Sequence, residues 1–180
     1  MKQASKSALM DFFEVLDKRV STRAFLDKEI EGEKLQQILE AAVSAPSAGN
    51  LQAFKIIAVK EQGMKKALAE AAIGQGFVAK APVVLVFFAD PEKSSARYGQ
   101  RGKELYCIQD AAIACCYAQL AAAALGLASV WVGAFDGAKV KKALGVEGSL
   151  KPVALLPIGH AGESPFRAKK QGLARLVQFV

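Results

Sequence analysis

Apolar residues recur at helical spacing in two segments near the start of the chain. This pattern predicts a helix from about Ser5 to Lys18 and a second helix from about Gly32 to Val43. The apolar positions that define the two stripes are Leu9, Phe12, Phe13, Leu16, Leu35, Ile38, Leu39 and Ala42. Since the residue before a proline disfavours helical backbone, we expect the second helix to end at Pro46.

Short apolar runs further along the chain have the length and composition of strands. Val83–Phe88 is apolar at every position, which predicts a strand buried on both faces. The other predicted strands are Phe54–Val59, Ala128–Val132 and Pro152–Ile158, and the predicted helices are Met64–Ala72, Leu105–Leu125 and Gly137–Leu144. Because helices and strands alternate without strict βαβ regularity, we expect an α+β fold with a central mixed, mainly antiparallel sheet flanked by helices. The absence of a long linker or repeat predicts a single domain over residues 1–180.

Two segments depart from this alternation. Asp90–Lys103 contains Pro91, two serines and Gly99, which predicts a loop and a candidate lid. Leu173–Val180 is apolar for a terminus, so we expect it to dock on another surface.

The charge balance narrows the class of partner. The chain has 24 Lys and Arg against 17 Asp and Glu, a net charge of +7, which suits an anionic ligand such as a phosphorylated cofactor. The basic residues are spread out, without zinc-finger spacing or an aromatic ladder, so we expect no nucleic-acid partner. Asp11 and Glu14 interrupt the N-terminal apolar pattern and Gln119 interrupts the longest apolar run. We therefore expect no secretory signal, no membrane partner and a cytoplasmic location.

The cysteines and the single histidine offer little chemistry of their own. Cys107, Cys115 and Cys116 lack CxxC spacing, and we expect them to act as small buried apolar residues. His160 has neither a nucleophile nor a second metal ligand beside it in the sequence, so we expect a structural role. This scarcity argues against a hydrolase or a metalloenzyme.

Two motifs follow the first two predicted helices. In an extended segment Arg19, Ser21 and Arg23 would share one face and form a row of cation, hydroxyl and cation, which suits a phosphorylated, hydroxyl-rich ligand. A solvated loop would have the same residues. In Ala45–Gln52, small and turn-forming residues surround amides that can pair with the edge of a heterocycle. Taken alone, however, the segment is better explained as a simple helix-to-strand connection.

Two further motifs lie in the second half of the chain. In Gly126–Asp136 a strand runs into a turn of small residues, where Gly133 would let its backbone amide approach a flat ligand. We expect Trp131, in the same segment, to lie in the core. Arg167-Ala-Lys169-Lys170 is, by itself, typical of a solvated basic patch.

Taken in this order, the motifs resemble those of the nitroreductase family of FMN enzymes. That family has an R-x-S-x-R row, A-P-S-x-x-N-x-Q after the second helix, a long helix opened by an Asp, G-L-x-S-x-W-x-G, and a late basic pair. The matching positions here are Arg19, Ser21, Arg23, Ala45–Gln52, Asp110, Gly126–Gly133, Arg167 and Lys169. The chain departs from the family pattern at Val20, where a second Arg is common, and at Ala53-Phe54, where Pro-Trp is common. It is also short for the family, and the shortening bears on the acceptor pocket.

The resemblance implies a homodimer with FMN at the subunit interface and NADH or NADPH as co-substrate. Arg19, Ser21, Arg167 and Lys169 would hold the phosphate and ribityl chain, and Arg23 would lie beside the pyrimidine end of the flavin. The partner subunit would supply Pro46, Ser47 and Asn50. The Gly133 amide would face flavin N5, and Gln75 would touch the pyrimidine edge.

The implied activity is transfer of hydride from NAD(P)H through flavin N5 to a small organic electrophile such as a nitroaromatic or a quinone. No catalytic side chain is required, because the flavin supplies the reactive atom. Two alternatives remain at this point: a specialised enzyme of the same fold, such as a dehydrogenase or a flavin-consuming enzyme, and a module that binds or stores FMN without turnover.

Overall fold

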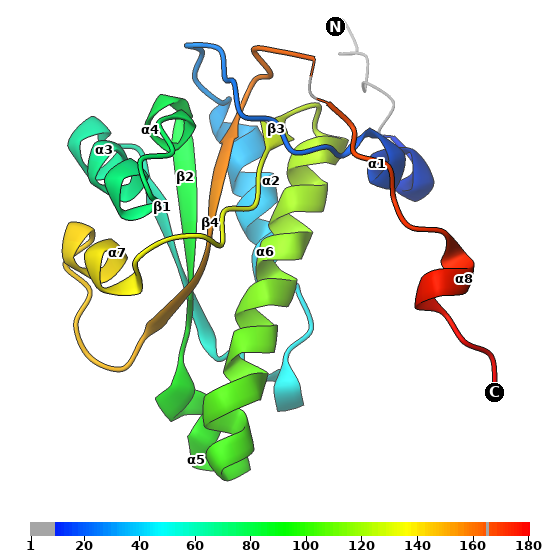
Figure 1. Ribbon diagram of the computed structural model, residues 1–180. Coiled ribbons are helices and arrows are strands. Elements are labelled where there is room, and N and C mark those ends of the chain that lie inside the picture. Colours follow the sequence, from blue (N-terminus) through cyan, green and yellow to red (C-terminus); the bar gives the residue numbers. More distant parts are fainter. Residues whose placement is uncertain (1–9, 165) are drawn as a thin grey trace, which may run out of the picture.

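A run of seven apolar residues forms the centre of the sheet in the computed structural model, which describes residues 10–164 and 166–180 (Figure 1). This strand, β2 (Val83–Ala89), is buried along its whole length, as its composition predicts. It pairs with β1 (Phe54–Val59) on one side and with β4 (Lys151–Gly159) on the other. The short strand β3 (Ala128–Ser129) completes the order β1-β2-β4-β3, and all three pairings are antiparallel. A single parallel bridge, between Ser21 and Ser129, makes the sheet mixed at this edge.

The two faces of the sheet support two helical layers. Alternate residues of a strand point to opposite faces, so Leu85 and Phe87 join one apolar cluster while Val84, Val86 and Phe88 join the other. Helices α2 (Gly32–Val43) and α6 (Cys107–Ala124) cover the first face. Helices α3 (Gln62–Ala71), α4 (Phe77–Lys80) and α7 (Gly137–Ala143) cover the second face, to the left in Figure 1. The α+β prediction is confirmed.

The long helix α6 is the core helix of the first layer. Its small residues Ala114, Cys115, Ala118 and Ala122 are fully buried against α2 and the sheet, which permits close packing. Gly126 follows it with a positive φ of 72°, as expected for a glycine after a helix C-terminus. By length and composition, the helical stretch Pro91–Ala124 is sufficient to cross a membrane, but here it packs on β1, β2 and β4.

The first helix is shorter than predicted. Helix α1 (Phe12–Lys18) begins after Asp11, whose carboxylate accepts a hydrogen bond from the Glu14 amide, while the Glu14 side chain bonds back to the Asp11 amide. The predicted start at Ser5 lies outside the described residues.

The predicted loop over Asp90–Lys103 is wrong. Helix α5 (Pro91–Arg101) and a short π-helix, η2 (Gly102–Tyr106), lead directly into α6. Asp90 caps α5 by accepting from the Lys93 amide, and proline at the first helical position needs no donor there. Gly99, with φ 57° and ψ −142°, kinks the helix where a loop residue was expected.

Two short helices complete the described chain. The 3-10 turn η1 (Ala48–Asn50) follows α2, and α8 (Leu173–Leu176) lies near the C-terminus. Every residue from 166 to 180 is exposed, so the apolar tail does not dock on its own chain. The predicted strand Ala128–Val132 is shorter than expected and continues only as an isolated bridge between Val132 and Leu155.

Candidate functional site

The row predicted after α1 has the expected alternation. Ser21 bridges Ser129 at the sheet edge, and the Thr22 amide donates to the Ser129 carbonyl at 3.2 Å. The Thr22 side chain is buried. Because neighbours in an extended segment point to opposite sides, Arg19, Ser21 and Arg23 instead line one cavity.

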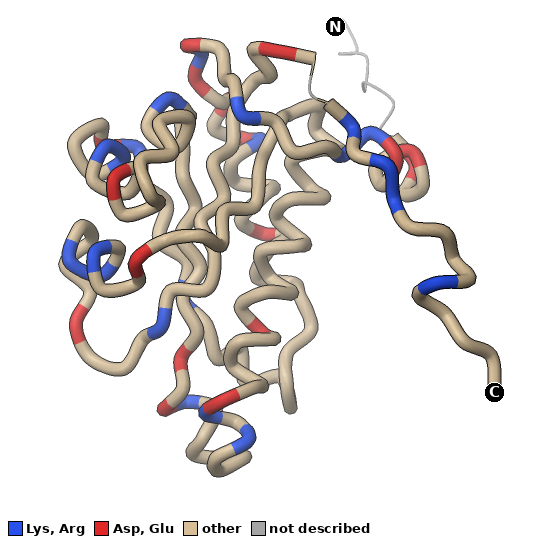
Figure 2. The backbone as a smooth tube through the Cα atoms, viewed as in Figure 1, with Lys and Arg blue, Asp and Glu red and all other residues tan. Residues whose placement is uncertain are grey.

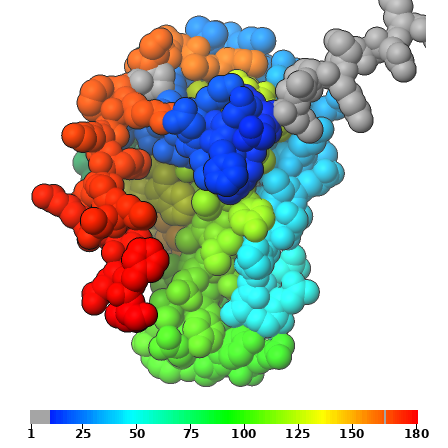
Figure 3. Space-filling view, turned by 90° about the vertical axis from the view of Figure 1, so that its right-hand side faces the viewer, coloured from blue at the N-terminus to red at the C-terminus, as the bar shows by residue number. Residues whose placement is uncertain are grey.

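This basic cavity, of about 690 Å³, lies between α1 and residues 166–170, the first part of the C-terminal segment 166–180 (Figure 3). Figure 2 shows positive charge on both segments that meet there. Its cations are Arg19, Arg23, Arg167, Lys169 and Lys170, and Asp17 is the one carboxylate among its described lining residues. Phe13 and Phe166 add aromatic surface. Five of the predicted cofactor residues, namely Arg19, Ser21, Arg23, Arg167 and Lys169, therefore lie together.

A turn before the C-terminal segment holds the two walls of the basic cavity in place. One carboxylate oxygen of Glu163 accepts hydrogen bonds from the amides of Arg23 at 2.9 Å and Ala24 at 3.1 Å. The Gly162 amide donates to the Ala24 carbonyl at 2.9 Å. These contacts hold the backbone at Arg23, the last residue of the Arg19 row, beside the segment that carries Arg167. They thereby shape the basic cavity.

The basic cavity contains an ion pair that a bound anion would replace. Arg167 donates to the Asp17 carboxylate at 2.7 Å, and both side chains are more than half exposed. Such solvated pairs contribute little stability, about 0–1 kcal/mol. A phosphate offers the guanidinium two acceptor oxygens and more charge, so it can displace Asp17.

The Pro46–Asn50 loop has a tightly specified backbone. Gly49 and Asn50 both have φ 55°, and an added Cβ at Gly49 would overlap the Tyr98 hydroxyl. Glycine is thus required there by conformation and by close approach. The Ser47 hydroxyl accepts from the Gln52 amide at 2.8 Å, while Pro46 and Asn50 are exposed.

Asp110 ties this loop to α6. Its Oδ1 accepts from the Ala48 amide at 2.9 Å, although the residue is only 2% exposed. Its Oδ2 is buried without a hydrogen-bond partner among the described residues. Asp110 is the one charged residue of α6, and this charge in a helix rich in small apolar residues is the sequence signal for the contact.

The loop and the Arg19 row lie at opposite ends of α6. The loop contacts Asp110 near the start of the helix, whereas Arg19 shares a smaller cavity with Ala123 near its end. At 1.5 Å per residue, Asp110 and Ala123 are about 20 Å apart along the helix axis. In Figure 1 the loop is the cyan segment beside the lower half of α6, and the row lies near α1 at the top. One chain therefore does not bring these predicted site residues together.

Gln75 and Gly133 lie close to each other, but neither is part of the basic cavity or of the Pro46–Asn50 loop. The Gln75 side-chain amide donates to the carbonyls of Ala72 at 2.8 Å and Ala134 at 3.3 Å. Gly133 is exposed, and an added Cβ there would meet only the Trp131 ring within 4 Å. The predicted core position of Trp131 is wrong, since 36% of the residue is exposed. Its neighbours Val130 and Val132 are buried, so Trp131 points to the opposite side of this extended segment.

The cysteines show no sign of catalytic activation, and the described residues contain no metal cluster. Burial raises the pKa of the Cys115 and Cys107 thiols, which keeps both protonated, while Cys116 is exposed, contrary to the prediction for all three cysteines. Among the described residues, no three His, Cys, Asp or Glu side chains are grouped as metal ligands.

Comparisons with known proteins identify the family of the chain. The sequence model of the nitroreductase family matches residues 16–78 and 65–160. An NADH dehydrogenase of Thermus thermophilus is 32% identical over 187 residues, covering 89% of this chain and 91% of that protein. An NAD(P)H-dependent FMN reductase of Bacillus subtilis is 33% identical over 156 residues, covering 79% of this chain and 63% of that protein.

Solved structures show the same fold. The NADPH:FMN oxidoreductase of Vibrio harveyi, solved with NAD⁺, superposes with a TM-score of 0.85 and 25% identity, covering 93% of this chain and 75% of that one. The family match covers most of the chain, and the solved structures share its fold. The chain belongs to the nitroreductase family.

Proposed function

We propose that this protein is an NAD(P)H-dependent flavin oxidoreductase that holds FMN and reduces a small organic electrophile, such as a nitroaromatic or a quinone. The family match and the names of the relatives support the reaction class. The single observation that carries the cofactor assignment is the basic cavity, which gathers five cations and the Ser21 hydroxyl.

The donors of the basic cavity fit one end of FMN. Guanidinium and ammonium groups suit a phosphate dianion, and the Ser21 hydroxyl suits a ribityl chain. We assign Arg19, Ser21, Arg167 and Lys169 to these two parts. Each charge-assisted bond of this kind contributes about 1.5–3 kcal/mol, so two or three of them are sufficient for firm retention of a phosphorylated cofactor.

The other assigned residues orient the ring system. The chemistry that FMN supplies when bound is acceptance of a hydride from the nicotinamide ring and its transfer to the acceptor. Arg23 would place a cation near the pyrimidine end, where it would stabilise negative charge on the reduced cofactor. The exposed Gly133 amide would face N5, and Gln75, whose side-chain nitrogen donates to backbone carbonyls, would offer its side-chain carbonyl to the ring edge. These roles need no side-chain acid or base.

A homodimer completes the site. Pro46, Ser47 and Asn50 lie about a helix length from the Arg19 row, so a second chain is required to place such a loop against the same flavin. The C-terminal segment supplies apolar surface for this contact. Its exposed apolar residues are Phe166, Leu173, Leu176, Val177, Phe179 and Val180.

Helix α5 bears on which electrophile is accepted. Arg97 donates to the Gly49 carbonyl at 3.3 Å and stacks on Tyr98, so α5 packs against the loop that serves the flavin. We therefore propose that α5 lies on the side of the site from which the acceptor approaches. A specialised reaction of the same fold, or FMN storage without turnover, remains the competing function. We place the protein in the cytoplasm, since its cysteines are unpaired.

Three measurements test this proposal together. The purified protein is expected to be yellow and to release about one FMN per chain, identified by mass, as a one-site cofactor requires. Anaerobic reduction by NADH and by NADPH, followed by reoxidation with nitroaromatics, quinones and enones, tests turnover. Storage of FMN predicts flavin binding without NAD(P)H oxidation. A colourless protein that cannot be reconstituted with FMN contradicts the cofactor assignment itself.

A further inference from the structure

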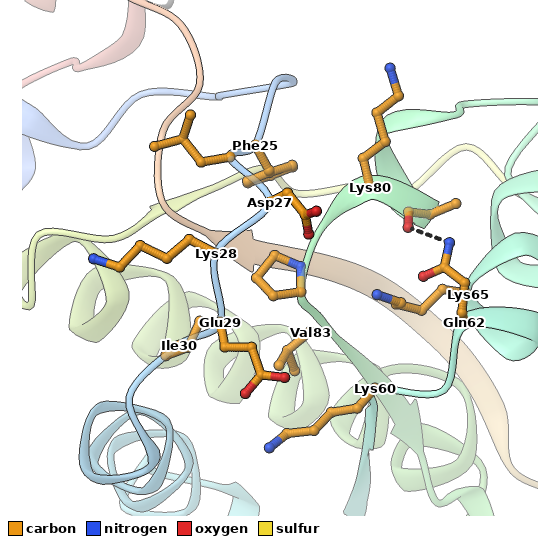
Figure 4. A pocket seen from close by; sticks show the side chains of 13 residues that line it. Phe25, Asp27, Lys28, Glu29, Ile30, Lys60, Gln62, Lys65, Lys80 and Val83 are labelled. Carbon is orange, nitrogen blue, oxygen red and sulfur yellow. Dashed lines mark hydrogen bonds between the residues drawn. The ribbon is translucent and has the colours of Figure 1, made fainter.

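A second cavity lies apart from the proposed flavin site (Figure 4). It has a volume of about 500 Å³ and lies between the strap 25–30, the start of α3, and the junction of α4 with β2. It shares no described lining residue with the basic cavity. Its floor is apolar and includes Phe25, Ile30, Pro82 and Val83.

Lys65 is the unusual residue of this strap cavity. The side chain lines the cavity, yet the residue is only 7% exposed. Its ammonium donates to the Ala81 carbonyl at 2.8 Å and forms no ion pair with a described carboxylate. Burial lowers the pKa of Lys65, because the charged ammonium loses solvation there.

A purely structural role accounts for only part of this arrangement. The hydrogen bond to Ala81 satisfies one carbonyl at the end of α4, but an ammonium has three donors. A neutral glutamine or serine would satisfy a carbonyl without bringing a charge into the interior. The open cavity in front of Lys65 gives the remaining donors a place to act.

The rim of the strap cavity carries both positively and negatively charged residues. Lys28, Lys60 and Lys80 outnumber Asp27 and Glu29. Figure 4 shows Lys65 and Asp27 pointing into the cavity from opposite sides, whereas Lys28 and Lys80 point away from it. Asp27 is exposed and interacts with Lys65 only at longer range, which partly offsets the cost of burial.

We propose that the strap cavity binds a small organic carboxylate, whose acid group pairs with Lys65 and whose apolar body packs on Phe25, Pro82 and Val83. A single negative charge matches the single buried cation. A carboxylate in the cavity can accept hydrogen bonds from the Lys65 donors that Ala81 does not use. Lys60 adds a second cation at the edge. Asp27 opposes the ligand, since both carry negative charge and both face Lys65.

The binding test uses FMN-loaded protein, so that the phosphate end of the flavin site is filled. The probe is pentanoate, which has no ring to stack on a flavin, and the control is 1-pentanol, which has a similar chain without the charge. Backbone NMR shifts of Phe25, Ile30 and Val83, and methyl shifts of Ile30 and Val83, report binding at this cavity. The flavin absorbance reports binding at the flavin site. Butyl phosphate tests whether a dianion binds as well.

Four variants separate the proposal from a structural role. Lys65→Met removes the buried charge and is expected to weaken pentanoate binding at least tenfold, as loss of a charge-assisted bond predicts. Lys66→Met is the matched control, an exposed neighbour on α3 that does not line the cavity, and it should bind as the wild type does. Lys60→Gln should weaken binding a few-fold. Asp27→Asn should strengthen it a few-fold by removing the competing charge.

The outcomes decide the proposal even if Lys65→Met folds poorly, because Asp27 and Lys60 are exposed and their variants should fold normally. Pentanoate shifts at the cavity, stronger for Asp27→Asn and weaker for Lys60→Gln, support the proposal. Absence of shifts in the wild type, equal shifts with 1-pentanol, tighter binding of butyl phosphate, or weaker binding by Asp27→Asn overturn it. Flavin absorbance and NAD(P)H oxidation are expected to be unchanged throughout.

Discussion

The Oδ1 atom of Asp110 accepts a hydrogen bond from the backbone amide of Ala48 at 2.9 Å, which ties the Pro46–Asn50 loop to the core helix α6. Asp110 is buried and the contact is partly buried, so solvent replaces it poorly if the acceptor is removed. Gly49 and Asn50 in the loop and Gln52 just after it have positive φ angles. The conformational preferences of Asn and Gln alone would not maintain such a backbone.

Replacement of Asp110 should therefore act through the loop. Asp110→Ala leaves the Ala48 amide unsatisfied and should lower the free energy of unfolding by about 1–3 kcal/mol and weaken FMN binding several-fold. Asp110→Asn keeps an acceptor oxygen and should stay close to the wild type. Urea unfolding and FMN titration measure both effects, with the exposed Gln109→Ala on the same helix as control. Equal effects of the Ala and Asn variants would contradict this role of the hydrogen bond.

The pair between Arg167 and Asp17 leads to a gain-of-affinity prediction. Asp17→Asn removes the carboxylate that competes with phosphate, so FMN affinity should rise about two- to fivefold, less than a full charge-assisted bond. Glu70→Gln changes the net charge equally on α3, outside the basic cavity, and controls for long-range attraction. If both variants raise the affinity equally, Arg167 is not released by loss of Asp17.

Arg19 and Arg23, at the two ends of the Arg19 row, should have different roles. Arg19→Ala should weaken FMN binding at least tenfold, since a charge-assisted bond to phosphate contributes about 1.5–3 kcal/mol. Arg23→Ala should mainly lower the reduction potential of the bound flavin, because it removes a cation that favours the reduced form. Titration of FMN and of the potential in both variants tests the division. Similar effects of the two changes on both quantities would refute it.

The pH dependence of stability tests the burial of Lys65. Its pKa is lowered in the folded state from the ordinary value of 10.5, so the unfolded chain binds more protons as pH rises toward that value. The cost of the buried cation is therefore complete at neutral pH and is lost as pH rises to 10.5. Relative to Lys65→Met, the wild type should gain stability over this range. The lost bond to Ala81 is a constant difference, so only the slope is diagnostic, and a zero slope would contradict the burial argument.

Much of the fold was predictable because burial dictates composition. The run Val83–Phe88 could only be a strand covered on both faces, and the small residues of α6 only a closely packed helix. Helix α5 was missed because its serines and glycine resemble a loop. Its start signals, Asp90 as cap and Pro91 at the first position, are local, but the contacts that stabilise it, such as Arg97 with the Gly49 carbonyl, join distant segments.

The site was predictable where one strand-like segment carries it. Alternation alone placed Arg19, Ser21 and Arg23 on one face. The meeting of this row with Arg167 depends on Glu163, whose bonds to the Arg23 and Ala24 amides have no local sequence signal. Lys65 looks like a surface residue in the sequence, and its burial arises only when the end of α4 packs over it.

The last prediction concerns the origin of each flavin site in two chains. The Arg19 row and the Asn50 loop lie at opposite ends of α6, so a row and a loop that serve one flavin must come from different subunits. A heterodimer with Arg19→Ala in one chain and Asn50→Ala in the other then has one site with both defects and one site with neither. Homodimers of either variant have two sites with one defect each.

The heterodimer is obtained by co-expression of the two variants under different affinity tags and sequential purification. Titration with FMN should give close to half the wild-type binding capacity at wild-type affinity, because the intact site is unaffected by the damaged one. If each site were built within one chain, both sites of the heterodimer would carry a defect and neither would bind with normal affinity. Binding no better than that of the two homodimers, or a wild-type protein that sedimentation shows to be a monomer, would therefore exclude the shared site, whereas weakened FMN binding by each homodimer confirms that both residues contribute.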